Sequence, residues 1–284
     1  MKRSAQYQKK HENVVAIQKT ATIFENVASI RIRQVKEQVL ASRGFFERLW
    51  SIYTSLRVDE KEAQAFGHAA TSDREVMVLI SSNYSLVGQV DSRLVDSCLQ
   101  AYDARTTDLI VIGSHAGRIL KDRGVTPTQV FPLPDITKPI DIENIVAVLA
   151  QYAAPVVYYP SYISLPEQRI VNFTLIEAVQ TLSEAEQRER PEGLIYAKEC
   201  IFEPSEGELI SYLESMMIQA ILTEVILEAS LAHFASRFTA MSFAEERAGD
   251  IDKGLVRMAK RMKRLEHDEL DRSFQTRKAG VFNS

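Results

Sequence analysis

All nine prolines of this 284-residue chain lie between Pro127 and Pro204. Proline removes a backbone donor and clashes with the preceding turn, so it breaks the interior of an α-helix. Residues 1–126 and 205–284 are free of it, so the chain can begin and end with long uninterrupted helices, whereas the middle has to fold differently.

Apolar residues recur near both ends at alternating spacings of three and four residues, the pattern of a helix that pairs along a narrow seam. The N-terminal seam consists of Val14, Ile17, Ala21, Phe24, Ala28, Ile32, Val35, Val39, Ser42, Phe46, Leu49, Tyr53 and Leu56. The C-terminal seam consists of Leu227, Leu231, Phe234, Phe238, Met241, Ala244, Ala248, Ile251, Leu255, Met258, Met262 and Leu265.

The lengths of these patterns exclude two ordinary core helices. A helix over residues 7–57 would be about 77 Å long and one over residues 208–278 about 105 Å. A compact protein of this chain length is only about 50 Å across. We therefore expect the two ends to cover each other as an antiparallel coiled coil.

The middle of the chain has short apolar runs that are typical of buried strands, at residues 76–80, 109–112, 156–159 and 169–175. Helical spacing over residues 94–102 and 142–152 separates some of them, and residues 177–192 are polar, as in a surface loop or short helix. The sequence thus predicts a small Rossmann-like α/β domain with a parallel sheet over residues 59–204. The long helices occupy residues 1–58 and 205–284 and pair with each other.

Composition indicates an ordinary soluble globular protein, with 45% hydrophobic and 25% charged residues. Cys98 and Cys200 are too few for a disulfide framework, so we expect reduced thiols in a cytoplasmic protein without a secretory signal or membrane span. Six basic residues precede four acidic ones over residues 253–271, but no groove-reading motif accompanies them. A charged coiled-coil face that meets an acidic protein ring is favoured over nucleic acid.

No motif in the chain predicts catalysis, a bound cofactor or a metal ion. There is no P-loop, and the turns at residues 81–88 and 113–117 contain too few glycines for a dinucleotide site. The five histidines lack metal-ligand spacing, and His115 is interpreted as a lone loop histidine.

Five short stretches, in this order and spacing, make the chain resemble the gamma subunit of F-type ATP synthases. They are Ile17-Gln-Lys-Thr-Ala-Thr-Ile-Phe24, Ala41-Ser-Arg43, Ile80-Ser-Ser-Asn-Tyr-Ser-Leu-Val-Gly88, Phe202-Glu-Pro-Ser205 and Arg237-Phe-Thr-Ala-Met241. The chain departs from the family pattern at residues 83–85, 244–248 and 272–284, which would fit a divergent copy encoded by an alternate operon.

The resemblance implies a non-catalytic rotor without a cofactor. It implies alpha and beta subunits in a 3:3 hexamer, an epsilon subunit and a membrane c-ring as partners, at the cytoplasmic face of a bacterial inner membrane. By motif match, the candidate hexamer contacts are Gln18, Lys19, Phe24, Arg261 and Arg264. The family-motif residues with an expected structural role are Arg43, Ser82, Gly88, Glu203, Pro204, Arg237 and Met241.

Three alternatives stay open at this point. Phe24 falls on the seam, so packing between the helices is favoured for it over a hexamer contact. The whole chain could instead be a coiled-coil scaffold or chaperone-like protein. It could also be a small-molecule enzyme whose site lies near Asn83 or His115.

Overall fold

The computed structural model describes residues 2–56, 72–136, 138, 140–175 and 206–281. They form two compact units, one made of Met1–Val27 and Phe238–Ser284, the other of Ala28–Arg237. Helix α1 (Lys2–Leu56, 55 residues) and helix α6 (Glu206–Val281, 76 residues) run through both units. At 1.5 Å per residue these helices are about 83 Å and about 114 Å long, which confirms the two long helices expected from the sequence.

The helices of the first unit pair antiparallel. His11 contacts Asp252, and Glu25 contacts Glu245, so residue numbers rise along α1 as they fall along α6. Buried seam residues line both helices, namely Ala21 in α1 and Met241 and Ala248 in α6.

The prediction of a buried seam is wrong at four positions. Ile17, Ile251, Met258 and Leu265 are 46–58% exposed. Beyond Ala248 the half-buried face of α6 continues through Asp252, Leu255, Ala259 and Met262. The heptad spacing used for the prediction considers only apolar residues. Asp252 nevertheless lies in the interface between α1 and α6, because His11 of α1 is its partner.

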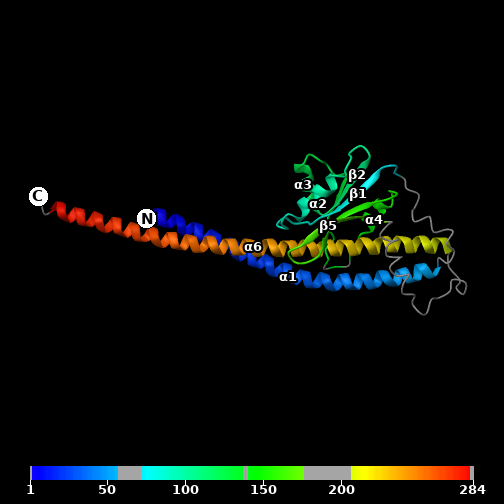
Figure 1. Ribbon diagram of the computed structural model, residues 1–284, viewed down its shortest axis with the longest axis horizontal. Helices are drawn as coiled ribbons and strands as arrows, with labels where there is room; N and C mark the ends of the chain where they lie inside the picture. Colours follow the sequence, from blue (N-terminus) through cyan, green and yellow to red (C-terminus); the bar gives the residue numbers. More distant parts are fainter. Residues whose placement is uncertain (1, 57–71, 137, 139, 176–205, 282–284) are drawn as a thin grey trace. The chain divides into compact units, whose positions relative to one another are not determined.

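The second unit contains a five-stranded sheet, of which Figure 1 labels β1, β2 and β5. The strand order is β3-β2-β1-β4-β5. The strands are β1 (Glu75–Ile80), β2 (Thr107–Ile112), β3 (Gln129–Phe131), β4 (Val156–Tyr162) and β5 (Gln168–Thr174). Strands β1 to β4 are parallel, as predicted for β1, β2 and β4, but β5, which was also expected in the parallel sheet, runs antiparallel to β4. The reason is the short connection over residues 163–167, since only an antiparallel pair can be joined by a tight turn.

Side chains of the strands alternate between two apolar layers. Met77 and Leu79 of β1 pack with α2 (Val90–Leu99) and α3 (Ser114–Asp122) on one face. Val76 and Val78 face the opposite way, toward α4 (Glu143–Leu149) and residues Leu213–Ala229 of α6. Leu49 of α1 joins this second layer, so both long helices contribute to the core of the unit.

Neither α3 nor β3 was predicted from the sequence, and β3, with three residues, is too short for a periodicity signal. The helix after β1 was expected four residues too late, over residues 94–102. The interpretation of residues 177–192 and of Cys200 lies outside the described residues. Cys98 is a buried free cysteine beside Met77, and burial raises the pKa of its thiol to about 12.

The segment Ser215–Arg272 of α6 contains a window long and apolar enough to cross a membrane. However, 61% of that window is buried inside the structure. The apolar residues of α6 thus serve largely as core residues.

Candidate functional site

The turn that follows β1 depends on a close backbone approach from the end of β2. Gly113 has a φ of 105°, and a Cβ atom there would lie 2.0 Å from the carbonyl oxygen of Ser81. Only glycine fits such a contact. The ends of the two strands are therefore held together tightly, as the hydrogen bond from the Ser81 amide to the Ile112 carbonyl also shows.

The first amides of α3 are hydrogen-bonded to this turn. The His115 amide donates to the Ser82 carbonyl (2.9 Å), the Ala116 amide to Ser81 Oγ (3.2 Å), and the Ser114 amide to Asn83 Oδ1 (3.4 Å). In doubly wound folds the equivalent amides at this edge of the sheet bind phosphate. Here the chain itself satisfies them.

Asn83 acts as a clamp within the sheet domain. Its side-chain amide donates to the Leu133 carbonyl (2.8 Å), and its Oδ1 accepts from the Leu133 amide (2.9 Å). Both the donor and the acceptor of the Asn83 side-chain amide are thus bonded to the backbone of Leu133, as expected for a residue with a structural role. His115 lies on α3, so its interpretation as a loop histidine is wrong.

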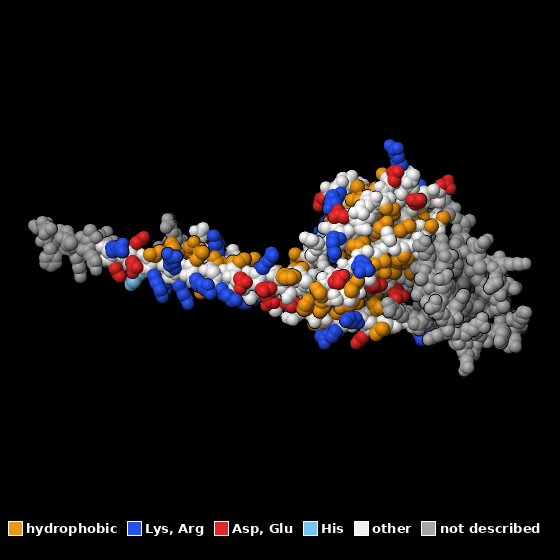
Figure 2. Space-filling view, in the orientation of Figure 1, with side chains coloured by type: hydrophobic (Ala, Val, Ile, Leu, Met, Phe, Trp, Pro, Cys, Tyr) orange, Lys and Arg blue, Asp and Glu red, His pale blue; other side chains and the backbone are white. Residues whose placement is uncertain are grey.

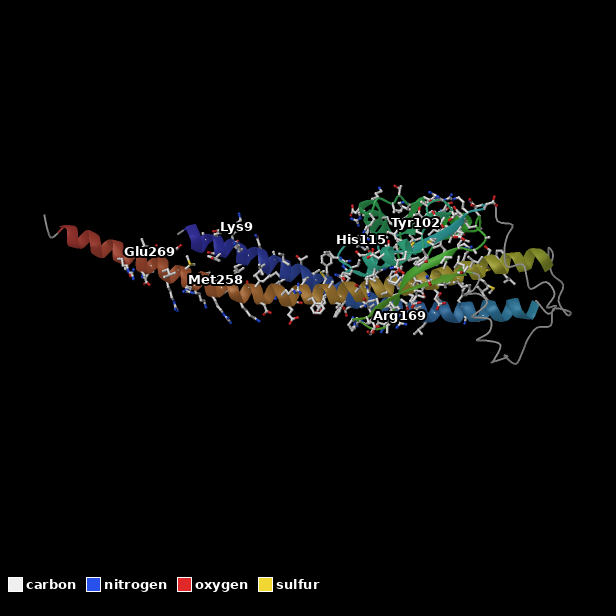
Figure 3. All side chains as sticks on the ribbon, turned by 45° about the horizontal axis from the view of Figure 1, so that its top comes forward. Lys9, Tyr102, His115, Arg169, Met258 and Glu269 are labelled. Atoms are coloured by element: carbon white, nitrogen blue, oxygen red, sulfur yellow. The ribbon has the colours of Figure 1, made fainter. Side chains whose placement is uncertain are left out.

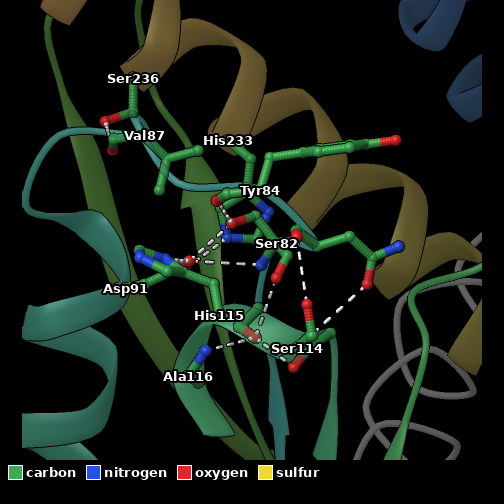
Figure 4. Close-up of polar contacts among 12 residues, drawn as sticks. Ser82, Tyr84, Val87, Asp91, Ser114, His115, Ala116, His233 and Ser236 are labelled. Atoms are coloured by element: carbon green, nitrogen blue, oxygen red, sulfur yellow. Dashed lines mark hydrogen bonds and ion pairs between the residues drawn. The ribbon is translucent and has the colours of Figure 1, made fainter. Parts of the chain in front are cut away.

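The polar contacts around this turn meet at the fully buried carboxylate of Asp91, which belongs to α2 (Figure 4). Its Oδ2 accepts from Ser82 Oγ (2.8 Å) and is 2.7 Å from His115 Nδ1. Its Oδ1 is 2.8 Å from His233 Nε2, and His233 belongs to α6. One carboxylate thus joins the turn after β1, α2, α3 and the long C-terminal helix.

Electrostatics keep this buried carboxylate ionised. Burial by itself would raise the pKa of Asp91, because it disfavours the charged form. The charge of His233 and the hydrogen bonds from His115, His233 and Ser82 outweigh burial and hold the pKa of Asp91 well below its ordinary value. Asp91 is therefore a charged acceptor at neutral pH.

Two more residues of α6 reach the same turn, on the helix face that His233 occupies. Ser236 Oγ donates to the Val87 carbonyl (2.7 Å), and the Arg237 guanidinium lies 5.8 Å from the ring centre of Tyr84. Positions three and four residues apart share one helix face, which explains why these three side chains meet one turn.

A second polar contact between α6 and the sheet lies at β4. Ser161 Oγ donates to Glu228 Oε1 (2.5 Å), and the Tyr159 hydroxyl donates to the other oxygen (3.4 Å). Unlike Asp91, Glu228 is only partly buried.

The candidate hexamer contacts of the N-terminal helix lie in the first unit. Lys19 is exposed, whereas Gln18 and Phe24 are half-buried. The Gln18 amide nitrogen lies 3.7 Å from where a Cβ atom of Gly249 would be, so this side chain faces α6. Half-burial of Phe24 fits both packing and an outside contact, and its assignment stays a prediction.

Both C-terminal hexamer candidates are exposed. Arg261 and Arg264 are exposed on α6, in a segment where Lys and Arg side chains project to solvent with hydrophobic side chains such as Met258 between them (Figures 2 and 3). Met241, a family-motif residue with an expected structural role, is 7% exposed and lies in the helix pair. Their roles in a complex remain predictions.

The family-motif residues of the sheet domain fall at the turn. Ser82 bonds Asp91, and Gly88 has a φ of 64°, a left-handed conformation that favours glycine. Arg43 lies on α1, with no description of its side chain, and Glu203 and Pro204 lie outside the described residues.

The pairing of Asp91 with His233 was not predicted from the sequence. The two residues are 142 positions apart, and neither stands in a recognised motif. The single available signal was that Asp91 lies at the start of an apolar helix, on the side that Val90, Leu94 and Val95 bury.

Comparison with protein families gives one match that spans nearly the whole chain. The family model ATP-synt, described as ATP synthase, matches residues 4–264.

Curated relatives agree with that match. The ATP synthase gamma chain of Halothermothrix orenii is 24% identical over 247 residues, covering 83% of this chain and 84% of that protein. The ATP synthase gamma chain of Prochlorococcus marinus is 25% identical over 285 residues, covering 86% and 90%.

Solved structures show the same fold. A chain of the Tetrahymena thermophila mitochondrial ATP synthase central stalk and c-ring matches with a TM-score of 0.57 at 16% identity, covering 79% of this chain and 99% of that one. A chain of the Euglena gracilis mitochondrial ATP synthase matches with a TM-score of 0.58 at 16% identity, covering 98% and 94%.

Proposed function

The chain belongs to the ATP synthase gamma-chain family, and from this premise we propose that it is the non-catalytic rotor in the central stalk of an F-type ATP synthase. In this role it couples ion flow through the membrane sector to ATP synthesis or hydrolysis in the alpha-beta hexamer. The coiled-coil scaffold and the small-molecule enzyme have no comparable support, since the relatives and structures named above are ATP synthase chains.

The observation that carries the proposal is the continuity of the two helices. An uninterrupted α6 of 76 residues is long enough to pass through a ring of subunits, and its antiparallel pairing with α1 stiffens it. A helix keeps its backbone hydrogen bonds internal, so torque applied at one end is transmitted along it without remodelling the chain.

The absence of catalysis in this subunit is part of the proposal. Groups that an enzyme of this fold would present to a ligand are engaged within the chain, as in the clamp of Asn83 and the amides of Ser114, His115 and Ala116. Chemistry then takes place in the partner subunits, and this chain only biases their conformations.

The partner assignment follows the two units. The paired helices, with Lys19, Arg261 and Arg264 on their surface, would contact the alpha and beta subunits. The sheet domain would meet the epsilon subunit and the c-ring. We place the chain at the cytoplasmic face of a bacterial inner membrane, peripheral through its complex.

The mechanism requires an asymmetric rotor. Three chemically identical catalytic subunits meet different side chains of the helix pair at any moment. Each conformation is stabilised in proportion to its differential contacts with the rotor, so rotation redistributes the three states in turn.

Co-expression with the alpha and beta subunits from the same source tests the proposal. We expect a complex of about 3:3:1 whose sustained ATP hydrolysis depends on this chain. The chain with its last helix cut after Lys260 is the comparison that probes the tip. A chain that self-associates and never joins the hexamer would rule out the rotor and favour a scaffold.

A further inference from the structure

We propose that Asp91 is the joint residue of the rotor, the buried carboxylate that fixes the sheet domain in angle and register on α6 through His233. It is a positioning residue, because it would act on torque transfer and touches no substrate. This proposal rests on the rotor function proposed above.

The apolar contact between the sheet and α6 is extensive but not directional. Met217, Ile221 and Ile226 of α6 pack with Val78 and Val157 of the sheet, all nearly or fully buried. Apolar burial scales with area and tolerates small rotations and slides of one surface over another. It holds the domain on the helix but sets its angle only loosely.

A hydrogen bond to a buried carboxylate has a fixed direction. His233 Nε2 meets Asp91 Oδ1 at 2.8 Å, and both side chains are at most 5% exposed. Turning the domain about α6 would break this bond and leave an ionised oxygen buried without its partner, which is costly because the interior cannot solvate it. The angle of the domain is therefore defined at this point.

Asp91 is also held firmly on the domain side. Three atoms lie within 3.3 Å of its Oδ2, namely Ser82 Oγ, the Ser82 amide nitrogen and His115 Nδ1. Ser82 lies in the turn after β1, and His115 lies in α3. Load that reaches Asp91 from His233 is thus distributed into the turn after β1, α2 and α3 rather than onto one side chain.

The bond to Asp91 dominates the polar contacts of the His233 imidazole. Its Nδ1 is buried without a hydrogen-bond partner among the described residues, so the bond to Asp91 is the polar contact that fixes this imidazole. Two other hydrogen-bonded contacts named above connect the sheet domain to α6. Ser236 Oγ donates to the neutral carbonyl of Val87, so breaking that bond leaves no buried charge. The Glu228 contact is only partly buried, and water can replace its bonds at little cost.

The test measures the torsional stiffness of the joint in the assembled complex of the full chain with the alpha-beta hexamer. A bead is attached to the sheet domain through Lys121→Cys or to α6 through Tyr212→Cys, both exposed, with Cys200→Ser removing another thiol. The angular variance of each bead is recorded while the rotor is stalled, because variance is inversely proportional to stiffness.

Breaking the joint should loosen the domain and leave the helix unchanged. His233→Leu removes the donor, and the population of the loosened domain should rise about tenfold. The variance of the domain bead then exceeds the wild-type value, whereas that of the α6 bead does not. Asp91→Asn keeps the shape of the side chain but removes its charge. The bead variances of this variant provide a second test if His233→Leu fails to fold.

Two further variants separate a joint from general destabilisation. His233→Gln places an amide donor near the position of Nε2 and should restore the narrow variance. Asp108→Asn is the matched control, because this carboxylate is bound by Arg74 and Tyr152 within the same domain. It should lower thermal stability without widening the angle.

The outcomes are distinct. A wild-type chain that never enters the hexamer overturns the rotor function itself. A wild-type complex that turns, with both His233→Leu and Asp91→Asn beads as narrow as wild type, overturns the joint alone. Equal widening by Asp108→Asn would also overturn it, since any loss of stability would then have the same effect.

Discussion

At the scale of single residues, the turn after β1 is determined by one glycine and one carboxylate. Gly113 lets the ends of β1 and β2 approach within contact distance. Asp91 accepts hydrogen bonds from residues of the surrounding segments. Neither feature is replaceable by a residue of similar size, because one position requires the absence of a side chain and the other requires a charge.

Replacing Gly113 with alanine should destabilise the full chain by about 3 kcal/mol, combining strain at positive φ with overlap onto Ser81. Gly124→Ala is the matched control, because Gly124 has a φ of 77° but open space around its Cβ position. It should cost only about 1 kcal/mol. Urea unfolding of both variants checks this, and equal losses would contradict the steric reason.

Asp91 should also make stability depend on pH in the acid range. Because its folded pKa is depressed, its contribution is fully present above the unfolded pKa and is lost as pH falls below about 4. Asp91→Asn should be about 3 kcal/mol less stable at pH 7, and the difference should shrink in acid. Thermal unfolding from pH 7 to pH 3 measures it; a constant difference would disprove an ionised Asp91.

At the scale of elements, the helix pair of the first unit has polar groups at seven-residue intervals along α1. His11, Gln18 and Glu25 are half-buried and face Asp252, Gly249 and Glu245 of α6. Polar residues at such positions specify register and lower stability. The pair is thus defined in register more by these contacts than by a continuous apolar seam.

Glu25 and Glu245 form a like-charge pair that should weaken this unit. Desolvation and the neighbouring Glu245 raise the pKa of Glu25, which means that its ionised form is disfavoured in the folded state. Glu25→Gln should therefore stabilise the helix pair at neutral pH by a few tenths of a kcal/mol, and the gain should fade as pH drops toward the carboxyl range.

The control for this change is Glu246→Gln, the exposed neighbour of Glu245 on α6. Circular dichroism melts at pH 7 and pH 4 compare the two variants. Stabilisation of equal size by both would point to net charge instead of the facing pair.

At the scale of the whole molecule, the proposed partners are recognised through the charged outer face of the helices. Exposed pairs contribute modestly and are screened by salt. Arg261 and Arg264 should accordingly influence assembly more than folding.

The double variant Arg261→Ala, Arg264→Ala should bind the alpha-beta hexamer about fivefold more weakly at low salt, which corresponds to about 1 kcal/mol. The difference should vanish near 1 M salt, where charges are screened within about 3 Å. Binding is measured by titration of labelled chain into hexamer, with Arg257→Ala as the single-charge comparison on the same helix. Salt-independent weakening would mean that the tip acts through shape instead.

The sequence by itself determined the long helices, the inserted α/β domain and the family, because proline placement, heptad spacing and strand-length apolar runs are local in the chain. It also singled out Ser82 and Gly88, which lie in the turn after β1. Tertiary structure alone decided that β5 is antiparallel, that Asp252 replaces Ile251 in the interface, and that His233 meets Asp91. Those pairings join polar groups from distant positions, and a polar group becomes a core residue only when folding supplies its partner.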